Sequence, residues 1–267
     1  MKKKLIRIAL GIVVVYAIAC IAFFNFQERF LFYPTPLEAD YSYQFEVPYE
    51  EITLNTPDGA SLNMVQLKAD SAKSAIFYIH GNAGNNQSWG DVMGPITYFG
   101  QDVFIYDFRS FGKSSGDLSE ESLFADALLA YDAVAERFPE NKIIIYGRSM
   151  GTSLAAYVAS QRQEQMLVLE SPFYELYDAT KTFVPGFPPR FLMRYEMPTY
   201  DHLANAGSPT VIFHGTDDDV VPFSSGVALY NTVKDKNVRM VPIKGGRHND
   251  LDTFSNFQAE RAKIFNH

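Results

Sequence analysis

The clearest indication of the fold is the run Lys142-Ile143-Ile144-Ile145-Tyr146, which is followed at once by Gly147-Arg148-Ser149-Met150-Gly151. The first five residues form a largely apolar run typical of a strand buried on both faces, and a helical pattern follows to about residue 162. Between them lies a G-x-S-x-G pattern, which suits a sharp turn that lifts a serine hydroxyl clear of the backbone. The pentapeptide alone is a weak signal and also suits a glycine-rich turn with an incidental serine. Its place between a strand and a helix makes Ser149 the candidate nucleophile.

Comparable apolar runs occur on both sides of this stretch and predict further strands at Ala75–Ile79, Val103–Tyr106, Met166–Leu169, Thr210–Phe213 and Val238–Pro242. Helical patterns separate them, at about Ser88–Phe99, Glu120–Phe138, Gly151–Arg162, Ser224–Val233 and Asp252–Phe265. Two β-rich runs around a Pro-Asp-Gly turn, Glu51–Asn55 and Leu62–Lys68, predict a hairpin before them. This alternation predicts an α/β fold with a mostly parallel sheet, helices on both faces and an opening antiparallel hairpin.

A serine nucleophile needs a base, and that base is usually a histidine. His248 lies after the last expected strand in a loop that holds Gly245 and Gly246, where it could reach Ser149. The alternative is that His248 is a solvated loop residue. His80 and His214 each end an expected strand and precede a glycine, so we expect them to shape loops instead.

The histidine needs a carboxylate to orient it, and three follow the strand Thr210–Phe213, namely Asp217, Asp218 and Asp219. With a nucleophile turn of this kind the acid lies between the serine and the histidine in sequence, as these do. The spacing from the preceding His-Gly and to the following Val-Pro favours Asp218. A metal site is the competing interpretation, but no further acids stand at ligand spacing. We therefore expect no metal.

An acyl-transfer site also needs two backbone N–H groups that stabilise an oxyanion. Met150 directly follows the candidate nucleophile and supplies one. The loop after Ala75–Ile79, which reads His80-Gly81-Asn82-Ala83-Gly84-Asn85, supplies the other, with Asn82 the better placed. Glycine-rich loops also bind phosphate, but neither a P-loop lysine nor a dinucleotide context is present.

The order of these segments along the chain resembles the α/β-hydrolase superfamily. A further segment in the same order is Asp107-Phe108-Arg109-Ser110-Phe111-Gly112-Lys113-Ser114. The closest resemblance is to its membrane-anchored branch, the alpha/beta hydrolase domain-containing serine hydrolases. The resemblance implies that Ser149, Asp218 and His248 are nucleophile, acid and base, and that Asn82 and Met150 supply the oxyanion donors. Ser110 departs from the glycine usual in D-x-R-G-x-G-x-S. We expect Asp107 and Arg109 to form a structural ion pair near the site.

Residues 173–200, where this fold inserts its cap, hold eight aromatic residues and four prolines. This aromatic share, well above the 15% of the whole chain, predicts a short apolar lid over Ser149. Phe173, Phe183 and Phe187 are the expected substrate-binding residues. The alternative is an insert that buries its own aromatic side chains.

The N-terminal segment is cationic and apolar, in contrast to a chain whose net charge is −8 and whose composition does not favour nucleic-acid binding. Residues 8–24 carry no charge, and 5–26 are long enough to cross a bilayer. We expect a membrane anchor over 1–26 and a hydrolase domain over 27–267. Basic residues before the apolar run predict that the domain lies on the non-cytoplasmic side. Alternatives are a cleaved signal peptide ending at Ala19 and a lipoprotein modified at Cys20, the only cysteine.

The resemblance and the apolar cap together predict a membrane-anchored serine hydrolase, without a cofactor, that forms an acyl-enzyme on Ser149. The expected substrates are carboxylic esters or thioesters with apolar acyl groups. A peptidase or amidase of the same fold is the first alternative. The second is a catalytically silent binding module tethered to the membrane. Oligomeric state is left open.

Overall fold

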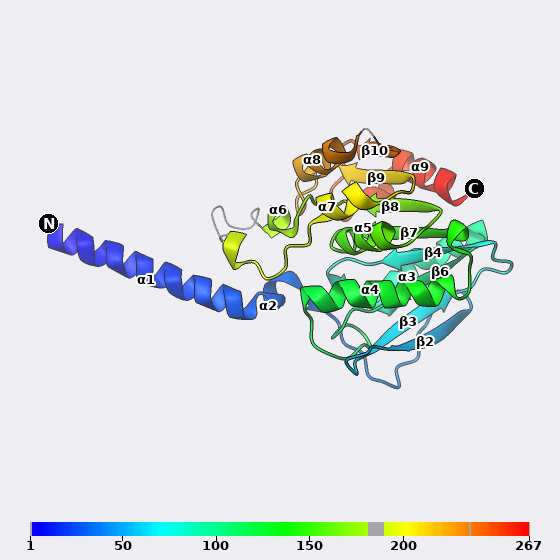
Figure 1. Ribbon diagram of the computed structural model, residues 1–267, viewed down its shortest axis with the longest axis horizontal. Helices are drawn as coiled ribbons and strands as arrows, with labels where there is room; N and C mark the ends of the chain where they lie inside the picture. The colour runs from blue at the N-terminus through cyan, green and yellow to red at the C-terminus, as the bar shows by residue number, and fades with distance from the viewer. Residues whose placement is uncertain (1, 181–189, 235, 267) are drawn as a thin grey trace.

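The computed structural model describes residues 2–180, 190–234 and 236–266, and its centre is an eight-stranded sheet (Figure 1). The strand order is β10-β9-β8-β7-β4-β6-β3-β2. The six neighbouring strands from β10 to β6 are parallel to one another, and β3 is antiparallel to both of its neighbours. The strands are β2 (Tyr49–Asn55), β3 (Ser61–Leu67), β4 (Ser74–Ile79), β6 (Gln101–Tyr106), β7 (Ile143–Arg148), β8 (Met166–Glu170), β9 (Thr210–Gly215) and β10 (Val238–Ile243). The expected parallel sheet with an opening hairpin is confirmed.

Two apolar cores lie on the two faces of the sheet because strand side chains alternate between faces. In β4, Phe77 and Ile79 belong to one core, and Ile76 and Tyr78 belong to the other. The first core packs against α4 (Glu120–Ala135), α5 (Gly151–Gln161), α7 (Thr199–Asn205) and α8 (Phe223–Val233). The second core packs against α3 (Asn86–Met93) and α9 (Ser255–Phe265).

Two of the expected helices are partly 3₁₀ helix in the structure. The helix expected over Ser88–Phe99 is α3 followed by the 3₁₀ helix η1 (Gly94–Phe99). Pro95 has no N–H for an α-helical hydrogen bond, so the regular helix ends before it. The helix expected from Asp252 is the 3₁₀ turn η4 (Leu251–Thr253) followed by α9. Another short 3₁₀ turn, η2 (Glu140–Lys142), leads into β7.

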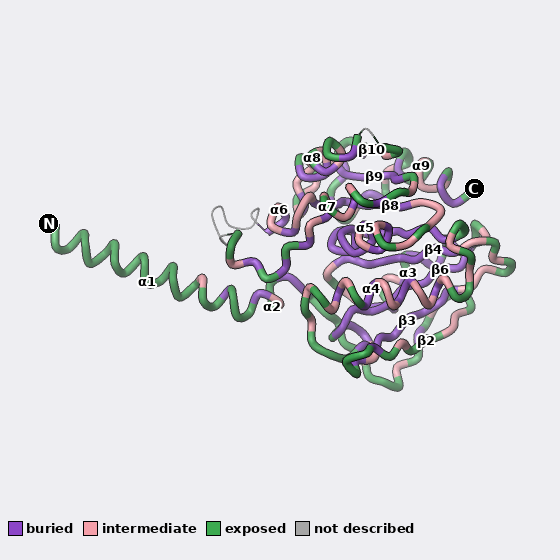
Figure 2. Tube along the Cα trace, viewed as in Figure 1, coloured by how far each residue is buried: buried purple, intermediate pink, exposed green. Residues whose placement is uncertain are grey.

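The helix α1 (Lys2–Phe26) projects from the body, and nearly all of it is exposed (Figures 1 and 2). Its mean hydropathy over the most apolar window is 2.6, and among the described residues it is the one helix long and apolar enough to cross a membrane. It ends at the residue where the expected anchor ends. A single turn of helix, α2 (Glu28–Leu31), and the short strand β1 (Tyr33–Pro34), which pairs with β5 (Ala83–Gly84), then join it to the body.

The chain between β8 and β9 forms the cap region. Its described parts are α6 (Leu176–Thr180), the 3₁₀ turn η3 (Arg190–Leu192) and α7. Phe183 and Phe187, two of the three expected substrate-binding residues, lie outside the described residues.

Candidate active site

Ser149 occupies a sharp turn between β7 and α5, with a left-handed φ of 51°. The turn brings backbone segments so close that its flanking glycines are required. A Cβ on Gly147 would lie 2.5 Å from the carbonyl oxygen of Gly151, and a Cβ on Gly151 would lie 2.1 Å from that of Ile79. The Ser149 N–H donates to the carbonyl of Glu170 on β8, at 2.8 Å, which ties the strained turn to the neighbouring strand.

His248 lies between Ser149 and Asp218, although 99 and 30 residues separate it from them. Its Nε2 is 3.0 Å from Ser149 Oγ, and its Nδ1 is 2.8 Å from Asp218 Oδ2. An ionised carboxylate can only accept hydrogen bonds, so Nδ1 carries the ring proton and donates it to Asp218. The lone pair on Nε2 is thereby left to accept the proton of the Ser149 hydroxyl. All three side chains are largely buried.

Asp218 is the carboxylate that contacts His248, whereas Asp217 and Asp219 are exposed. Burial favours a raised pKa for Asp218. The hydrogen bond and charge of His248, with N–H bonds from Val220 and Val221, outweigh burial and lower the pKa below its usual value. Asp218 therefore remains a carboxylate at neutral pH.

An arginine that the sequence analysis missed supports the His248 loop. Arg148, the residue before Ser149, donates to the carbonyl of His248 at 3.1 Å and to Asn249 Oδ1 at 3.0 Å. Its Nε lies 3.1 Å from the Glu170 carboxylate on β8. The sequence did contain a signal for this role, because an arginine inside the G-x-S-x-G turn lies at the carboxyl edge of the sheet. Its partner could not be named without the fold.

The pocket at Ser149 has a cavity of about 50 Å³ and includes Asn82 and Met150 among its walls. Neither backbone N–H donates to another residue among the described turn and loop contacts, so both are available to a ligand. The Asn82 side chain points elsewhere, because its Nδ2 donates to the carbonyl of Leu31 at 2.9 Å. Its side chain thus anchors the loop and leaves the backbone N–H as the possible oxyanion donor.

The remaining pocket walls are mainly apolar. Phe173, the described member of the expected substrate-binding set, is one of them, with Leu176, Ala179, Thr180 and Val220. Three further walls were not expected, namely Phe30, Leu31 and Tyr33, which follow α1 directly. The pairing of β1 with β5 places this segment at Ser149.

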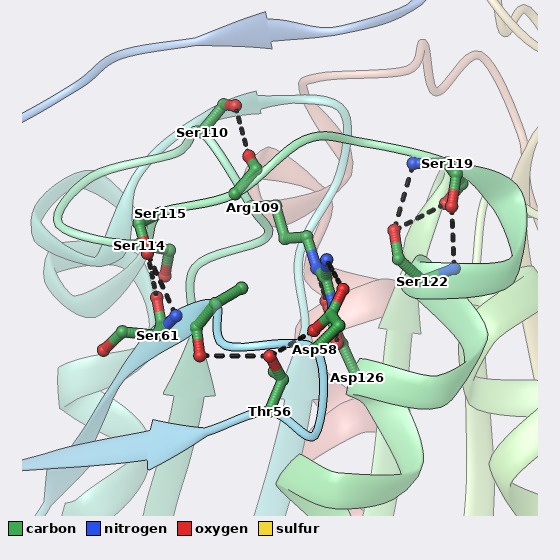
Figure 3. Close-up of polar contacts among 12 residues, drawn as sticks. Thr56, Asp58, Ser61, Arg109, Ser110, Ser114, Ser115, Ser119, Ser122 and Asp126 are labelled. Carbon is green, nitrogen blue, oxygen red and sulfur yellow. Dashed lines mark hydrogen bonds and ion pairs between the residues drawn. The ribbon is translucent and has the colours of Figure 1, made fainter.

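The expected ion pair between Asp107 and Arg109 is wrong. Arg109 instead pairs with Asp58 at 2.6 Å and with Asp126 at 2.7 Å, beneath the turn that holds Ser110 (Figure 3). Ser110 has a left-handed φ of 66°, which explains why glycine suits this position. A cavity of about 970 Å³ beside Arg109 includes none of Ser149, Asp218 and His248 in its walls.

Asp107 faces His80 inside the protein. His80 Nε2 lies 3.9 Å from Asp107 Oδ1, and both side chains are fully buried. Burial lowers the pKa of His80 to about 4 and raises the pKa of Asp107 well above its usual value. Burial thus disfavours the charged form of both side chains. His80 Nδ1 also contacts the carbonyl of Gly81 at 2.6 Å, which agrees with a role in shaping this loop.

His214 is buried behind Asp218. Its Nε2 lies 3.0 Å from the carbonyl of Val221 and 3.5 Å from Asp218 Oδ2. It supports the loop that carries the acid and does not contact Ser149 in the described contacts. Among the residues that the structure describes, no group of three or more histidine, cysteine or acidic side chains could hold a metal ion.

The sheet order, the strained serine turn and the histidine beside it define an α/β hydrolase of the serine hydrolase type. A family model described as serine aminopeptidase, S33, matches residues 70–195. An esterase of Pyrococcus furiosus superposes with a TM-score of 0.71 at 19% identity, covering 87% of this chain and 97% of that one. At that identity the likeness shows the fold alone.

Relatives at higher identity place the chain within the superfamily. It is 31% identical over 234 residues to alpha/beta hydrolase domain-containing protein 17C of Xenopus tropicalis, covering 85% of this chain and 73% of that protein. Identity to the human protein of the same name is 31% over 201 residues, covering 74% of this chain and 59% of the relative. The chain belongs to the α/β-hydrolase superfamily, in the branch of alpha/beta hydrolase domain-containing proteins.

Proposed function

We propose that the protein cleaves carboxylic esters or thioesters with apolar acyl groups, through an acyl-enzyme on Ser149. The observation that carries this proposal is the hydrogen-bonded series from Asp218 through His248 to Ser149, which opens on a largely apolar pocket. The chain's membership of a hydrolase family supports the reaction class. The apolar walls support the substrate class.

In the proposed reaction Ser149 Oγ attacks the acyl carbonyl as its proton moves to His248 Nε2. The negative charge that develops on the carbonyl oxygen is stabilised by the N–H groups of Asn82 and Met150, and loss of one such donor costs on the order of 3 kcal/mol. Nε2 then returns the proton to the leaving alcohol or thiol. Water, deprotonated by the same nitrogen, attacks the acyl carbon of the acyl-enzyme. The bond from that carbon to Ser149 Oγ then breaks, Nε2 returns the proton to Oγ, and the carboxylic acid is released. Asp218 holds the ring orientation and balances its positive charge throughout.

A fluorophosphonate probe tests the nucleophile directly. We expect covalent labelling of the wild type and none of Ser149→Ala, because the phosphorus forms a bond to the serine oxygen. Ser153, a buried serine on α5, supplies a matched control, and Ser153→Ala should label like the wild type. Equal labelling of Ser149→Ala and wild type would contradict the assignment.

A peptidase of the same fold is the second candidate, because the matching family model is described as serine aminopeptidase. An aminopeptidase needs an acidic group to hold the substrate's charged amine. No carboxylate belongs to the described walls of the Ser149 pocket, which disfavours this reading. Parallel panels of acyl esters and aminoacyl amides distinguish the two, and faster amide turnover would favour the peptidase.

We propose further that α1 anchors the enzyme in a membrane and that its active site is reached at the membrane surface. The uncharged run in α1, its exposure and the basic residues before it support a single crossing with the body on the non-cytoplasmic side. On this proposal the anchor over 1–26 and the hydrolase domain over 27–267 are the two functional parts of the chain.

A further inference from the structure

The base of the anchor is built into the active site. Phe30, Leu31 and Tyr33 form one wall of the Ser149 pocket, and they begin four residues after α1 ends. Four residues of helix rise about 6 Å, so this wall lies close to the end of the proposed membrane-spanning segment. Figure 1 shows α1 leaving the body beside α2, at the same end of the molecule as α6.

A buried glutamine fastens this junction to the cap region. Gln27 is 0% exposed, its Nε2 donates to the carbonyl of Leu192 at 3.3 Å, and its Oε1 accepts from the Arg194 N–H at 2.8 Å. Glu28 forms an ion pair with Arg194 and accepts a hydrogen bond from the Tyr195 hydroxyl. Because Gln27 and Glu28 are both bonded to the segment 192–195, the junction restricts rotation of the body relative to α1.

Exposed aromatic side chains surround the junction. Four of them, Phe26, Phe30, Tyr33 and Phe191, are 51%, 58%, 54% and 83% exposed, and we call them the collar. Water is a poor environment for such rings, and the described part of the body beyond α1 exposes few other large apolar side chains. Those others (Val92, Tyr98 and Phe99) come before the amino end of β6, whereas Ser149 follows the carboxyl end of the parallel strand β7.

The position of the collar identifies what covers it. A helix of 25 residues is about 37 Å long, so α1 crosses a hydrocarbon core of about 30 Å and its end lies in the headgroup region. Aromatic side chains and arginines are typical of that region. Arg29 lies over the Phe26 ring at 5.3 Å, and Arg194 lies over the Phe24 ring at 5.8 Å.

We propose that the collar seats the catalytic body on the lipid bilayer, so that the Ser149 pocket opens at the membrane–water interface and receives acyl chains from the lipid side. The inference rests on the proposed function for the identity of the reacting group, but the seating itself follows from the anchor and the collar. The substrate is then an acyl ester or thioester whose chain lies in the bilayer. Only the carbonyl and its nearest methylenes need to enter the 50 Å³ cavity, while the remaining chain stays among lipids.

A fluorophore measures the seating without any need for catalysis. In the full-length Cys20→Ser background, which has no other cysteine, Phe191→Cys and Tyr98→Cys are each labelled with a polarity-sensitive dye. The two positions are matched, because Phe191 is 83% exposed and Tyr98 is 76% exposed. In phosphatidylcholine proteoliposomes we expect blue-shifted emission, quenched by brominated lipid, at position 191 only. Equal emission at the two positions overturns the proposal.

Activity tests the consequence for substrate entry. The double variant Phe26→Ser/Phe191→Ser changes two collar residues that do not line the described pocket. Its kcat/KM should fall about tenfold for a long-chain ester carried in vesicles and stay unchanged for a short water-soluble ester, because only the first substrate needs the seated enzyme. Tyr98→Ser should match the wild type on both substrates. Equal loss on both esters, or no loss on either, overturns entry from the lipid side.

The two proposals fail in different ways. If the wild type hydrolyses neither ester and Ser149 is not labelled by the fluorophosphonate, the proposed function is contradicted. The dye measurement still decides the seating in that case.

Discussion

At the scale of single residues, the chemistry depends on a few atoms that lie far apart in the chain. Asp217, Asp218 and Asp219 are chemically alike, yet only Asp218 is turned inward, toward His248. The N–H groups of Val220 and Val221 hold its Oδ1 at 3.0 and 2.8 Å. The selection of one carboxylate from three is therefore made by the turn after β9, which buries the middle side chain and leaves its neighbours in water.

Substitution of each aspartate by asparagine tests this selection. We expect Asp218→Asn to lower kcat for an ester about 10³- to 10⁴-fold, because the amide no longer orients the ring or balances its positive charge. Asp217→Asn and Asp219→Asn should retain activity within about twofold, since surface side chains without such contacts contribute little. The measurement is steady-state hydrolysis, with circular dichroism as the check on folding. A comparable loss in either neighbour would contradict the assignment.

At the scale of the elements, strands were easier to predict than helices. Each strand of the parallel sheet begins within two residues of its expected start, because strands buried on both faces appear as continuous apolar runs. Helix ends depend on capping and on single residues. Ser119 and Ser122 form a reciprocal cap that starts α4, whereas Pro95 ends the regular part of the helix before β6.

A carboxylate between two elements gives a pH-dependent prediction. Glu164 lies in the turn from α5 to β8, where burial raises its pKa to about 7 and a hydrogen bond from Ser208 opposes part of that rise. The unfolded chain loses this proton near the usual value of 4.5, so between pH 4.5 and 7 the folded state binds more protons. Stability therefore falls as the pH rises through this window, and the full penalty is present above pH 7.

Glu164→Gln removes that penalty. We expect the variant to be more stable than the wild type by about 2 kcal/mol at pH 8, after allowance for partial solvent screening, and no more stable at pH 4. Urea unfolding at the two pH values measures the difference. Exposed Glu136→Gln, at the end of α4, is the control and should show no such pH-dependent gain.

At the scale of the whole molecule, the protein joins an exposed apolar helix to a body with two buried cores. The junction is ordered, since Phe23 is buried against the body and Phe32 packs on Tyr195 with ring centroids 5.1 Å apart. The anchor is thereby tied to the cap region and to the loop that carries Asn82. The crossing of a membrane by α1 stays a prediction from its length and apolar composition, and the side on which the body lies stays a prediction from the basic residues before the apolar run.

A single accessible cysteine tests that side. In the Cys20→Ser background, Asp70→Cys places a thiol on an exposed turn between β3 and β4. We expect a membrane-impermeant maleimide to label it in intact cells, because the basic N-terminus stays in the cytoplasm and the body is exported. A second cysteine variant, Lys3→Cys, should react only after lysis. Labelling in the reverse pattern would show the opposite orientation.

Local patterns in the chain were enough to predict the alternation of strands and helices, the serine turn, the membrane-length helix and a short set of polar residues for the site. These features depend on neighbours in the chain, through side-chain periodicity and through the glycines that a strained turn requires. Only the packed fold shows that Arg109 pairs with Asp58 and Asp126 and not with Asp107. It also decided that Phe30 and Tyr33, at the base of the anchor, line the pocket of Ser149. Those contacts join residues 17 to 119 positions apart, and their geometry arises when the sheet is packed, because no local pattern records which loops will meet at its edge.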